Sequence, residues 1–175
     1  MDTSQPTAPV STTSVALRYG LLTGLVSIIF SLIQFMTHTD QSPLRWLGLI
    51  ISIVGITLAH KEFKQRGDGF MSYGQGLGIG TLLSLIAGLM SAVFFYVYVT
   101  AIDATFVDHI MEVQRQQMEA KGLEEAQIDN AMEMSKPFMS PGVMSLFVIL
   151  FSAFFGFIIA LIVSAFTKNT RPEFE

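Results

Sequence analysis

Four long apolar stretches dominate this sequence and restrict the folds that it can adopt. Few charged side chains interrupt them, and they cover residues 17–36, 44–60, 73–101 and 142–166. A helix rises about 1.5 Å per residue, so about 20 apolar residues suffice to cross a hydrocarbon core of about 30 Å. The pattern predicts an all-α, polytopic membrane protein in which four transmembrane helices form a bundle.

The composition supports this class and excludes several functions. Only 14% of the 175 residues are charged and 51% are hydrophobic, whereas soluble domains contain about 25% charged residues. A net charge of −4 argues against a protein that binds nucleic acid through phosphate contacts. The sequence has no cysteine, which excludes disulfides, thiolate metal sites and cysteine nucleophiles.

Residues 17–168 are predicted to form a single transmembrane domain between two tails. Residues 1–16 are rich in Ser, Thr and Pro and should be disordered, and residues 169–175 form a C-terminal tail. The first apolar stretch is interpreted as an uncleaved span. A cleaved signal peptide is the competing interpretation, but no basic cluster precedes the stretch and no small-residue cleavage site follows it.

Ser-Pro pairs at 42–43 and 140–141 predict the starts of the second and fourth spans, because serine caps helices and proline suits their first turn. The second span is short, so Arg45 and His60 should reach water at opposite interfaces. A charged connector is expected from His60 to Gly69. Three aromatic residues are predicted to anchor the bundle at the membrane interfaces: Trp46, Tyr96 and Tyr98.

Residues 103–139 form a sizeable and strongly acidic extramembrane segment. Its three basic residues are Arg115, Lys121 and Lys136, and its net charge is −5 because it has eight acidic residues: Asp103, Asp108, Glu112, Glu119, Glu124, Glu125, Asp129 and Glu133. Apolar residues at helical spacing on either side of Lys121 and Gly122 predict two helices joined by a turn. We expect an acidic helical hairpin between the third and fourth spans.

The distribution of basic residues predicts the orientation of the chain. Cytoplasmic loops are enriched in Lys and Arg close to span ends. The residues expected to determine the topology lie after the second span and after the fourth: Lys61, Lys64, Arg66, Lys168 and Arg171. Both termini are therefore predicted in the cytoplasm, and the acidic hairpin in the periplasm or outside the cell.

Small residues recur at every fourth position of the spans, a spacing that lets membrane helices approach closely. We interpret them as packing positions within the bundle, with a homo-oligomer interface as the alternative. They are Gly20, Gly24, Gly76, Gly80, Ser84, Gly88, Ser152, Gly156, Ala160 and Ser164. The alternating glycines at 74–80 resemble a phosphate-binding loop only superficially, because no strand pattern precedes them and no Gly-Lys-Ser/Thr follows.

The sequence shows no convincing catalytic, cofactor or metal site. No charged or titratable residue is expected deep in a span, which disfavours a proton-coupled carrier. The alternative is a carboxylate and imidazole site at Asp103, Asp108 and His109, near the end of the third span. Six of the ten methionines lie between residues 111 and 144. Residues two apart on a helix point away from each other, so these methionines are interpreted as packing residues rather than Cu(I) ligands.

Three stretches of the chain resemble a family of uncharacterised, domain-of-unknown-function membrane proteins of Bacteroidota-type bacteria. They are RYGLLTGL at 18–25, GFMSYGQGLGIG at 69–80 and MEAKGLEEAQIDNAMEMSKPFMSP at 118–141. The resemblance implies a four-span architecture and a bacterial inner-membrane location, and it carries no functional residue.

We therefore expect a non-enzymatic structural or interaction protein of the bacterial inner membrane. Its acidic hairpin would contact a partner or the membrane surface. The expected partners are the lipid bilayer and either a second copy of the chain or a membrane or periplasmic protein, but not nucleic acid. The alternative is a small transporter or channel subunit that acts as an oligomer.

Overall fold

The computed structural model describes residues 10–37, 39 and 43–170 of the chain. These residues form helices joined by short connections, and an isolated antiparallel bridge pairs Met71 with Asn169. The all-α class predicted from the apolar stretches is confirmed for the described residues.

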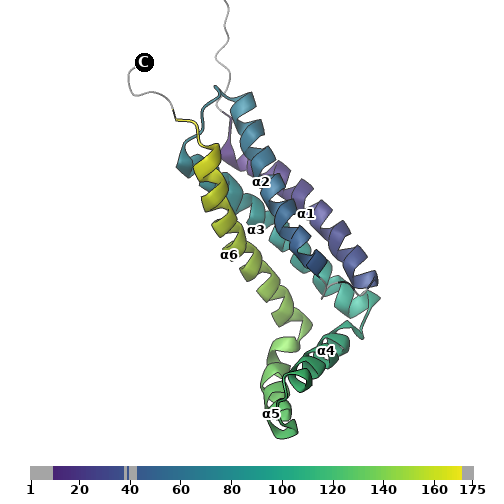
Figure 1. Cartoon of the computed structure of the whole chain (residues 1–175). Coiled ribbons are helices and arrows are strands. Elements are labelled where there is room, and N and C mark those ends of the chain that lie inside the picture. Colours follow the sequence, from purple (N-terminus) through teal and green to yellow (C-terminus); the bar gives the residue numbers. More distant parts are fainter. Residues whose placement is uncertain (1–9, 38, 40–42, 171–175) are drawn as a thin grey trace, which may run out of the picture. The chain divides into compact units, whose positions relative to one another are not determined.

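The chain divides into two compact units. Unit 1 holds Met1–Ser91 and Leu150–Glu175, and unit 2 holds Ala92–Ile149. In unit 1, four helices lie side by side (Figure 1): α1 (Thr12–Met36), α2 (Leu47–Arg66), α3 (Tyr73–Val97) and α6 (Pro141–Thr167). The end of α3 and the start of α6 belong to unit 2. A short 3₁₀ helix, η1 (Pro43–Trp46), precedes α2.

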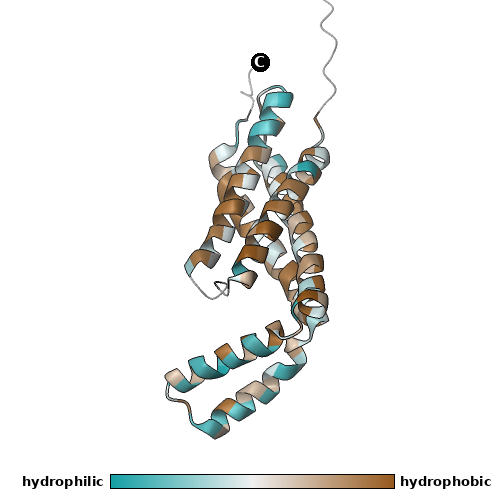
Figure 2. Cartoon of the chain, turned by 90° about the vertical axis from the view of Figure 1, so that its right-hand side faces the viewer, coloured by the Kyte–Doolittle hydropathy of each residue, from teal (hydrophilic) through white to brown (hydrophobic). Residues whose placement is uncertain are grey.

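Three helical segments are long and apolar enough to cross a membrane. They are Thr12–Met36, Tyr73–Ile102 and Pro141–Thr167, which match three of the predicted spans. Many large apolar side chains of unit 1 are exposed, and Figure 2 shows the apolar colour along the outer faces of its helices. Large exposed apolar surfaces mark sites of contact with a membrane or with another protein. The chain is therefore suited to insertion into a membrane.

Helix α1 begins inside the segment that was predicted to be a disordered tail. Ser11 caps the helix by accepting a hydrogen bond from the Ser14 amide (3.4 Å), and Val15 and Ala16 are buried. The predicted boundary at residue 16 is thus wrong, because a serine cap and two core contacts order these residues. The rest of the predicted tail, residues 1–9, lies outside the described residues.

Helix α2 continues through the predicted charged connector and ends at Arg66, where Gly67 caps it. Lys64 and Arg66 lie in its last turn, where positive charge is favourable to the helix dipole. Because the last turns of α2 are charged, α2 is not among the three helical segments that are apolar enough to cross a membrane. The predicted count of four spans is therefore not confirmed. The Ser42 cap predicted for this helix lies outside the described residues.

Helices α3 and α6 pack against each other in steps of four residues. An added Cβ at Gly76 would lie 2.9 Å from Ser164 Oγ, and one at Gly80 would lie 2.6 Å from Ala160 Cβ. One turn further along α3, Ser84 lies against Gly156. Each step forward in α3 is matched by a step back in α6, so the two helices are antiparallel neighbours in close contact. Ser152 Oγ also donates to the Ser84 carbonyl oxygen (3.0 Å).

Small residues bring α1 against its neighbours in the same way. A Cβ at Gly20 would lie 2.9 Å from Ile86 Cβ, and one at Gly24 would lie 2.8 Å from Met90 Sδ. Both neighbours belong to α3. On the other side, Thr23 of α1 lies directly on Gly55 of α2. Gly20, Gly24 and Gly55 therefore serve close contacts within unit 1.

Unit 2 contains the acidic hairpin, in which two helices run antiparallel (Figure 2). Its elements follow a π-helical turn, η2 (Tyr98–Ile102), and they are α4 (Phe106–Ala120), α5 (Glu125–Ser135) and the 3₁₀ helix η3 (Lys136–Met139). Gly122 lies between α4 and α5 with φ of +76°, a conformation that glycine adopts without strain. The prediction of two helices with a turn at residues 121–122 is confirmed.

The core of unit 2 is aromatic and includes one predicted interfacial anchor. The Tyr98 ring is only 4% exposed and packs edge-on against Phe106, with ring centroids 5.5 Å apart. Phe95 contacts the same Phe106 ring at 6.2 Å. Tyr98 is thus a core residue, and its predicted place at an exposed interface is wrong, whereas Trp46 and Tyr96 are exposed.

Candidate functional site

One arginine of the acidic hairpin is shared among three carboxylates. Arg115 of α4 contacts Glu119 of its own helix (3.2 Å) and reaches across to Asp129 (3.4 Å) and Glu125 (3.7 Å) of α5. The hydrogen bond to Glu119, followed by the charges of Asp129, Glu119 and Glu125, raises the pKa of Arg115 above its usual value. The guanidinium therefore stays charged at any physiological pH and ties the two helices together.

The three carboxylates around Arg115 and four further ones lie on the exposed surface of the hairpin. These exposed residues are Asp108, Glu112, Glu119, Glu124, Glu125, Asp129 and Glu133. Glu124 also caps α5 through a capping box with Gln127, whose side chain accepts from the Glu124 amide (3.2 Å). Carboxylates near a helix N-terminus are stabilised there. The structure thus orders an acidic surface on two helices rather than on a flexible loop.

Asp103, Asp108 and His109 have separate positions in this unit. Asp103 closes a local turn by accepting from the Thr105 amide (3.1 Å) and hydroxyl (2.7 Å). Asp108 and His109 are exposed in the first turns of α4. No group of three or more potential His or acidic metal ligands occurs among the described residues. These contacts of Asp103 are those of a turn-forming residue.

His60 is buried at the end of α2 instead of reaching water. Its side chain is 0% exposed, and its ring joins three helices of unit 1. Nε2 lies 2.9 Å from the Gly76 carbonyl oxygen of α3, and Nδ1 lies 2.7 Å from Thr167 Oγ1 of α6. The prediction that the His60 side chain reaches water is wrong, because partners remote in sequence supply both of its hydrogen bonds.

The same end of unit 1 gathers most basic residues that were predicted to set the topology. Lys64 Nζ donates to the Thr167 carbonyl oxygen (3.0 Å), and Arg18 of α1 pairs with Glu62 of α2 (3.2 Å). Arg66 also pairs with Glu62. Lys61 and Lys168 are exposed, and Arg171 lies outside the described residues. Contacts among α1, α2 and α6 therefore bring basic side chains from distant parts of the sequence to one end of the unit.

A capping box at the start of α3 was not predicted, although the Ser-x-x-Gln pattern that indicates it is present in the sequence. The Ser72 amide donates to Gln75 Oε1 (2.8 Å), and the Gln75 amide donates to Ser72 Oγ (3.2 Å). This reciprocal pair is a capping box of the form Ser-x-x-Gln. Gln75 thus has a role in starting α3.

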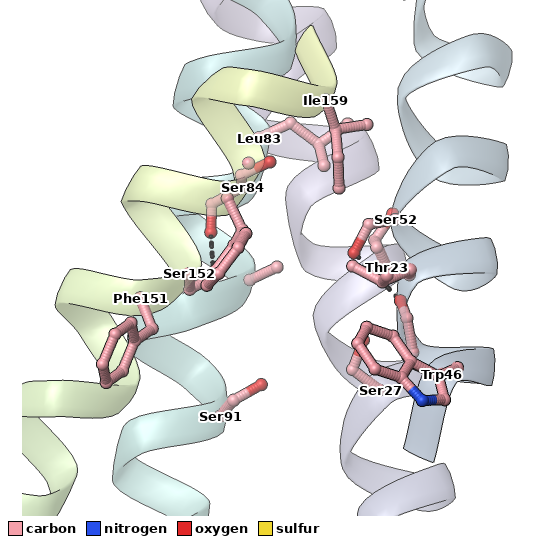
Figure 3. Close-up of a pocket in the computed structure, with 15 residues that line it drawn as sticks. Thr23, Ser27, Trp46, Ser52, Leu83, Ser84, Ser91, Phe151, Ser152 and Ile159 are labelled. Atoms are coloured by element: carbon pink, nitrogen blue, oxygen red, sulfur yellow. Dashed lines mark hydrogen bonds between the residues drawn. The ribbon is translucent and has the colours of Figure 1, made fainter. Parts of the chain in front are cut away.

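Unit 1 also contains a cavity of about 520 Å³ between its helices. All four helices contribute to its wall, and Figure 3 shows hydroxyl side chains from α1, α2, α3 and α6 around it. No charged residue lines it among the described residues. The cavity is an apolar space with hydroxyl groups on its wall.

A protein-family model described as Protein of unknown function (DUF4199) matches residues 18–169. The match covers every described helix except the first turns of α1. No curated protein and no solved structure matches the chain.

Proposed function

Because the chain belongs to the DUF4199 family, whose function is unknown, we propose from its own geometry that it is a non-enzymatic interaction protein of the bacterial inner membrane. It would cross the membrane four times, with both termini in the cytoplasm. Its acidic hairpin, residues 103–139, would bind a basic segment of a membrane or periplasmic protein. The observation that carries the proposal is the ordered acidic surface that Arg115 stabilises.

The contacts of α2 support a fourth span. The Arg18–Glu62 pair and the contact of Thr23 with Gly55 show that α2 runs antiparallel to α1. The large apolar side chains of α2 that are exposed would then face lipid: Leu47, Leu49, Ile50, Ile53, Val54 and Leu58. The charged last turns of α2 would reach the cytoplasmic interface, where Lys and Arg are favoured.

The natural absence of cysteine allows a direct test of this topology. Single cysteines replacing Lys61 and Glu133 would be labelled in intact cells with a membrane-impermeant maleimide. Both positions are exposed in the structure. We expect labelling at residue 133 from outside the inner membrane and labelling at residue 61 only after the membrane is permeabilised. Labelling of both positions from the same side would refute the four-span topology.

The hairpin is suited to a basic partner because its net charge is strongly negative and its carboxylates lie on two helices. Complementary charge speeds association and selects partners more than it adds raw affinity. Three of the carboxylates share Arg115, and the remaining exposed ones extend the acidic surface along both helices. Such binding should weaken as salt rises, since exposed charges are screened within about 8 Å at physiological ionic strength.

Photocrosslinking in cells tests the interaction. A photoreactive amino acid would replace Met134, which is 76% exposed on α5. We expect a discrete protein adduct that is lost in the double variant Glu112→Gln, Glu133→Gln, which leaves the carboxylates around Arg115 intact. The matched control is Asp68→Asn, an acid-to-amide change outside the hairpin. If no protein adduct forms, or if neutralising the hairpin leaves the adduct unchanged, the proposed role is wrong.

A further inference from the structure

The cavity of unit 1 is a recess between its helices that is open on one side, where Trp46 and Phe151 are exposed. This cavity measures about 520 Å³, within the range of about 300–1,000 Å³ that is typical of small-molecule sites. We propose that it binds an uncharged lipid, a molecule with a long hydrocarbon chain and a hydroxyl group.

The lining explains why the ligand would be uncharged. No described residue of the wall is charged, and a buried ion without a partner is costly. Six of the lining residues carry hydroxyl groups: Thr23, Ser27, Ser52, Ser84, Ser91 and Ser152. A hydroxyl group both donates and accepts hydrogen bonds, so it can pair with another hydroxyl in either direction. The remaining wall is apolar and fits a hydrocarbon chain.

Ser84 carries a buried hydroxyl group that would bond the ligand once its side chain turned from Gly156 toward the cavity. This residue is 5% exposed and lines the cavity, and its Oγ has no hydrogen-bond partner among the described residues. A buried hydroxyl without a partner costs about 1–3 kcal/mol. Ser52 and Ser152, by contrast, already donate to the carbonyl oxygens of Gly48 and Ser84, and their oxygens can still accept. A ligand hydroxyl that bonded Ser84 would remove an unmet hydrogen bond.

The space persists because small residues form part of the wall. Gly48 lines the cavity, and a Cβ added there would meet no atom within 4 Å. Ala87 of α3 and Gly156 of α6 also line it. Trp46 and Phe151 belong to the wall and yet are 59% and 57% exposed, so the cavity opens to the outside of the unit beside them. A lipid could therefore enter laterally from the bilayer.

Gly48 and Gly78 provide a matched pair of variants for the test. Both residues leave open space where a Cβ would be, but only Gly48 lines the cavity. Gly48→Phe should fill the cavity, whereas Gly78→Phe places the same ring on an exposed face of α3. Comparable melting temperatures for the two variants would show that each is folded.

The probe is hexadecanol carrying a diazirine and a terminal alkyne, added to the full chain in phosphatidylcholine nanodiscs. We expect saturable labelling of peptides that contain residues 46–52 and 151–156, competed by excess hexadecanol. Labelling should fall at least tenfold in Gly48→Phe and remain unchanged in Gly78→Phe. Ser84→Ala should weaken it severalfold without lowering the melting temperature, since the alanine removes an unpartnered hydroxyl.

Two results would overturn the proposal. Non-saturable labelling spread over the exposed phenylalanines of α6, and unchanged in Gly48→Phe, would mean that ordinary bilayer lipid fills the space. Crosslinks between two chains through the cavity, with no competition by hexadecanol, would mean that a second copy covers it. Should Gly48→Phe fail to fold, the Ser84→Ala variant decides the outcome, because unchanged labelling there also contradicts the assigned polar contact.

Discussion

The contact between Gly80 and Ala160 permits a test of the close packing between α3 and α6. In Gly80→Ala, the new Cβ would lie 2.6 Å from Ala160 Cβ and 3.2 Å from Ile56 Cγ2. Carbon atoms prefer separations of about 3.5–4.0 Å, so α3 and α6 would have to move apart by about 1 Å. That movement would loosen the adjoining contact of Gly76 with Ser164 and stretch the 3.0 Å hydrogen bond from Ser152 to Ser84.

Overpacking of this kind costs about 1–3 kcal/mol. For a chain of this length, each kcal/mol lowers the melting temperature by roughly 2–4 °C, so the expected fall is about 2–12 °C. Thermal unfolding in detergent, followed by circular dichroism, measures it. Gly78→Ala is the control, because its Cβ would meet no atom within 4 Å and alanine favours helix by about 0.8–1 kcal/mol. That variant should melt at or above the parent temperature.

The swapped variant Gly80→Ala, Ala160→Gly isolates the contact. It moves the methyl group from α6 to α3 and restores room between the two backbones. We expect it to recover part of the loss, with a coupling energy of about 0.5–3 kcal/mol in the double-mutant cycle. Equal melting temperatures for Gly80→Ala and Gly78→Ala would refute the argument, as would additive effects of the two changes in the cycle.

Two further predictions concern local order. Arg115→Gln should speed amide hydrogen exchange in α5, because three carboxylates lose their shared partner; the difference should shrink in high salt, and Lys121→Gln serves as the control. Ser72→Ala should cost about 0.5–2 kcal/mol and speed exchange in the first turn of α3, because Ser72 and Gln75 cap that helix, whereas Ser135→Ala should leave that turn unchanged.

The regular parts of the fold could be predicted because their signals are local or periodic. Small residues four apart indicated which faces of α3 and α6 pack closely, and the turn at Gly122 follows from a glycine between two amphipathic segments. The pairing of particular residues could not be predicted. Spacing alone does not tell that Gly80 meets Ala160, because the register of antiparallel helices depends on how their connections fold.

The errors have a common physical origin in contacts between remote segments. The His60 side chain was predicted to reach water from its place at the end of an apolar stretch, but Gly76 and Thr167 bury it. Tyr98 was assigned to an aromatic belt, but Phe106 covers its ring. The cavity is a further case, because residues of four helices form its wall and no single segment of the sequence predicts it.

The two hydrogen bonds of His60 define a final prediction. A carbonyl oxygen only accepts, so Nε2 carries the proton that bonds Gly76, and Nδ1 of a neutral ring accepts from Thr167. The Thr167 hydroxyl has one proton and also lies 2.8 Å from the Val163 carbonyl oxygen. In His60→Phe this hydroxyl can turn to Val163, and the Gly76 carbonyl keeps its helical partner, so no polar group is left without a hydrogen bond.

The expected loss in His60→Phe is therefore mainly that of the hydrogen bond to Gly76, about 0.5–1.5 kcal/mol in the free energy of unfolding, because Thr167 regains a partner in Val163. His60→Ala removes the ring as well and should cost more, because it leaves a void among α2, α3 and α6. Unfolding in detergent measures both variants, with His109→Phe, at an exposed position of α4, as the control. If His60→Phe were as stable as the parent, the ring would contribute packing alone, and the hydrogen bonds to Gly76 and Thr167 would not hold α2 to its neighbours.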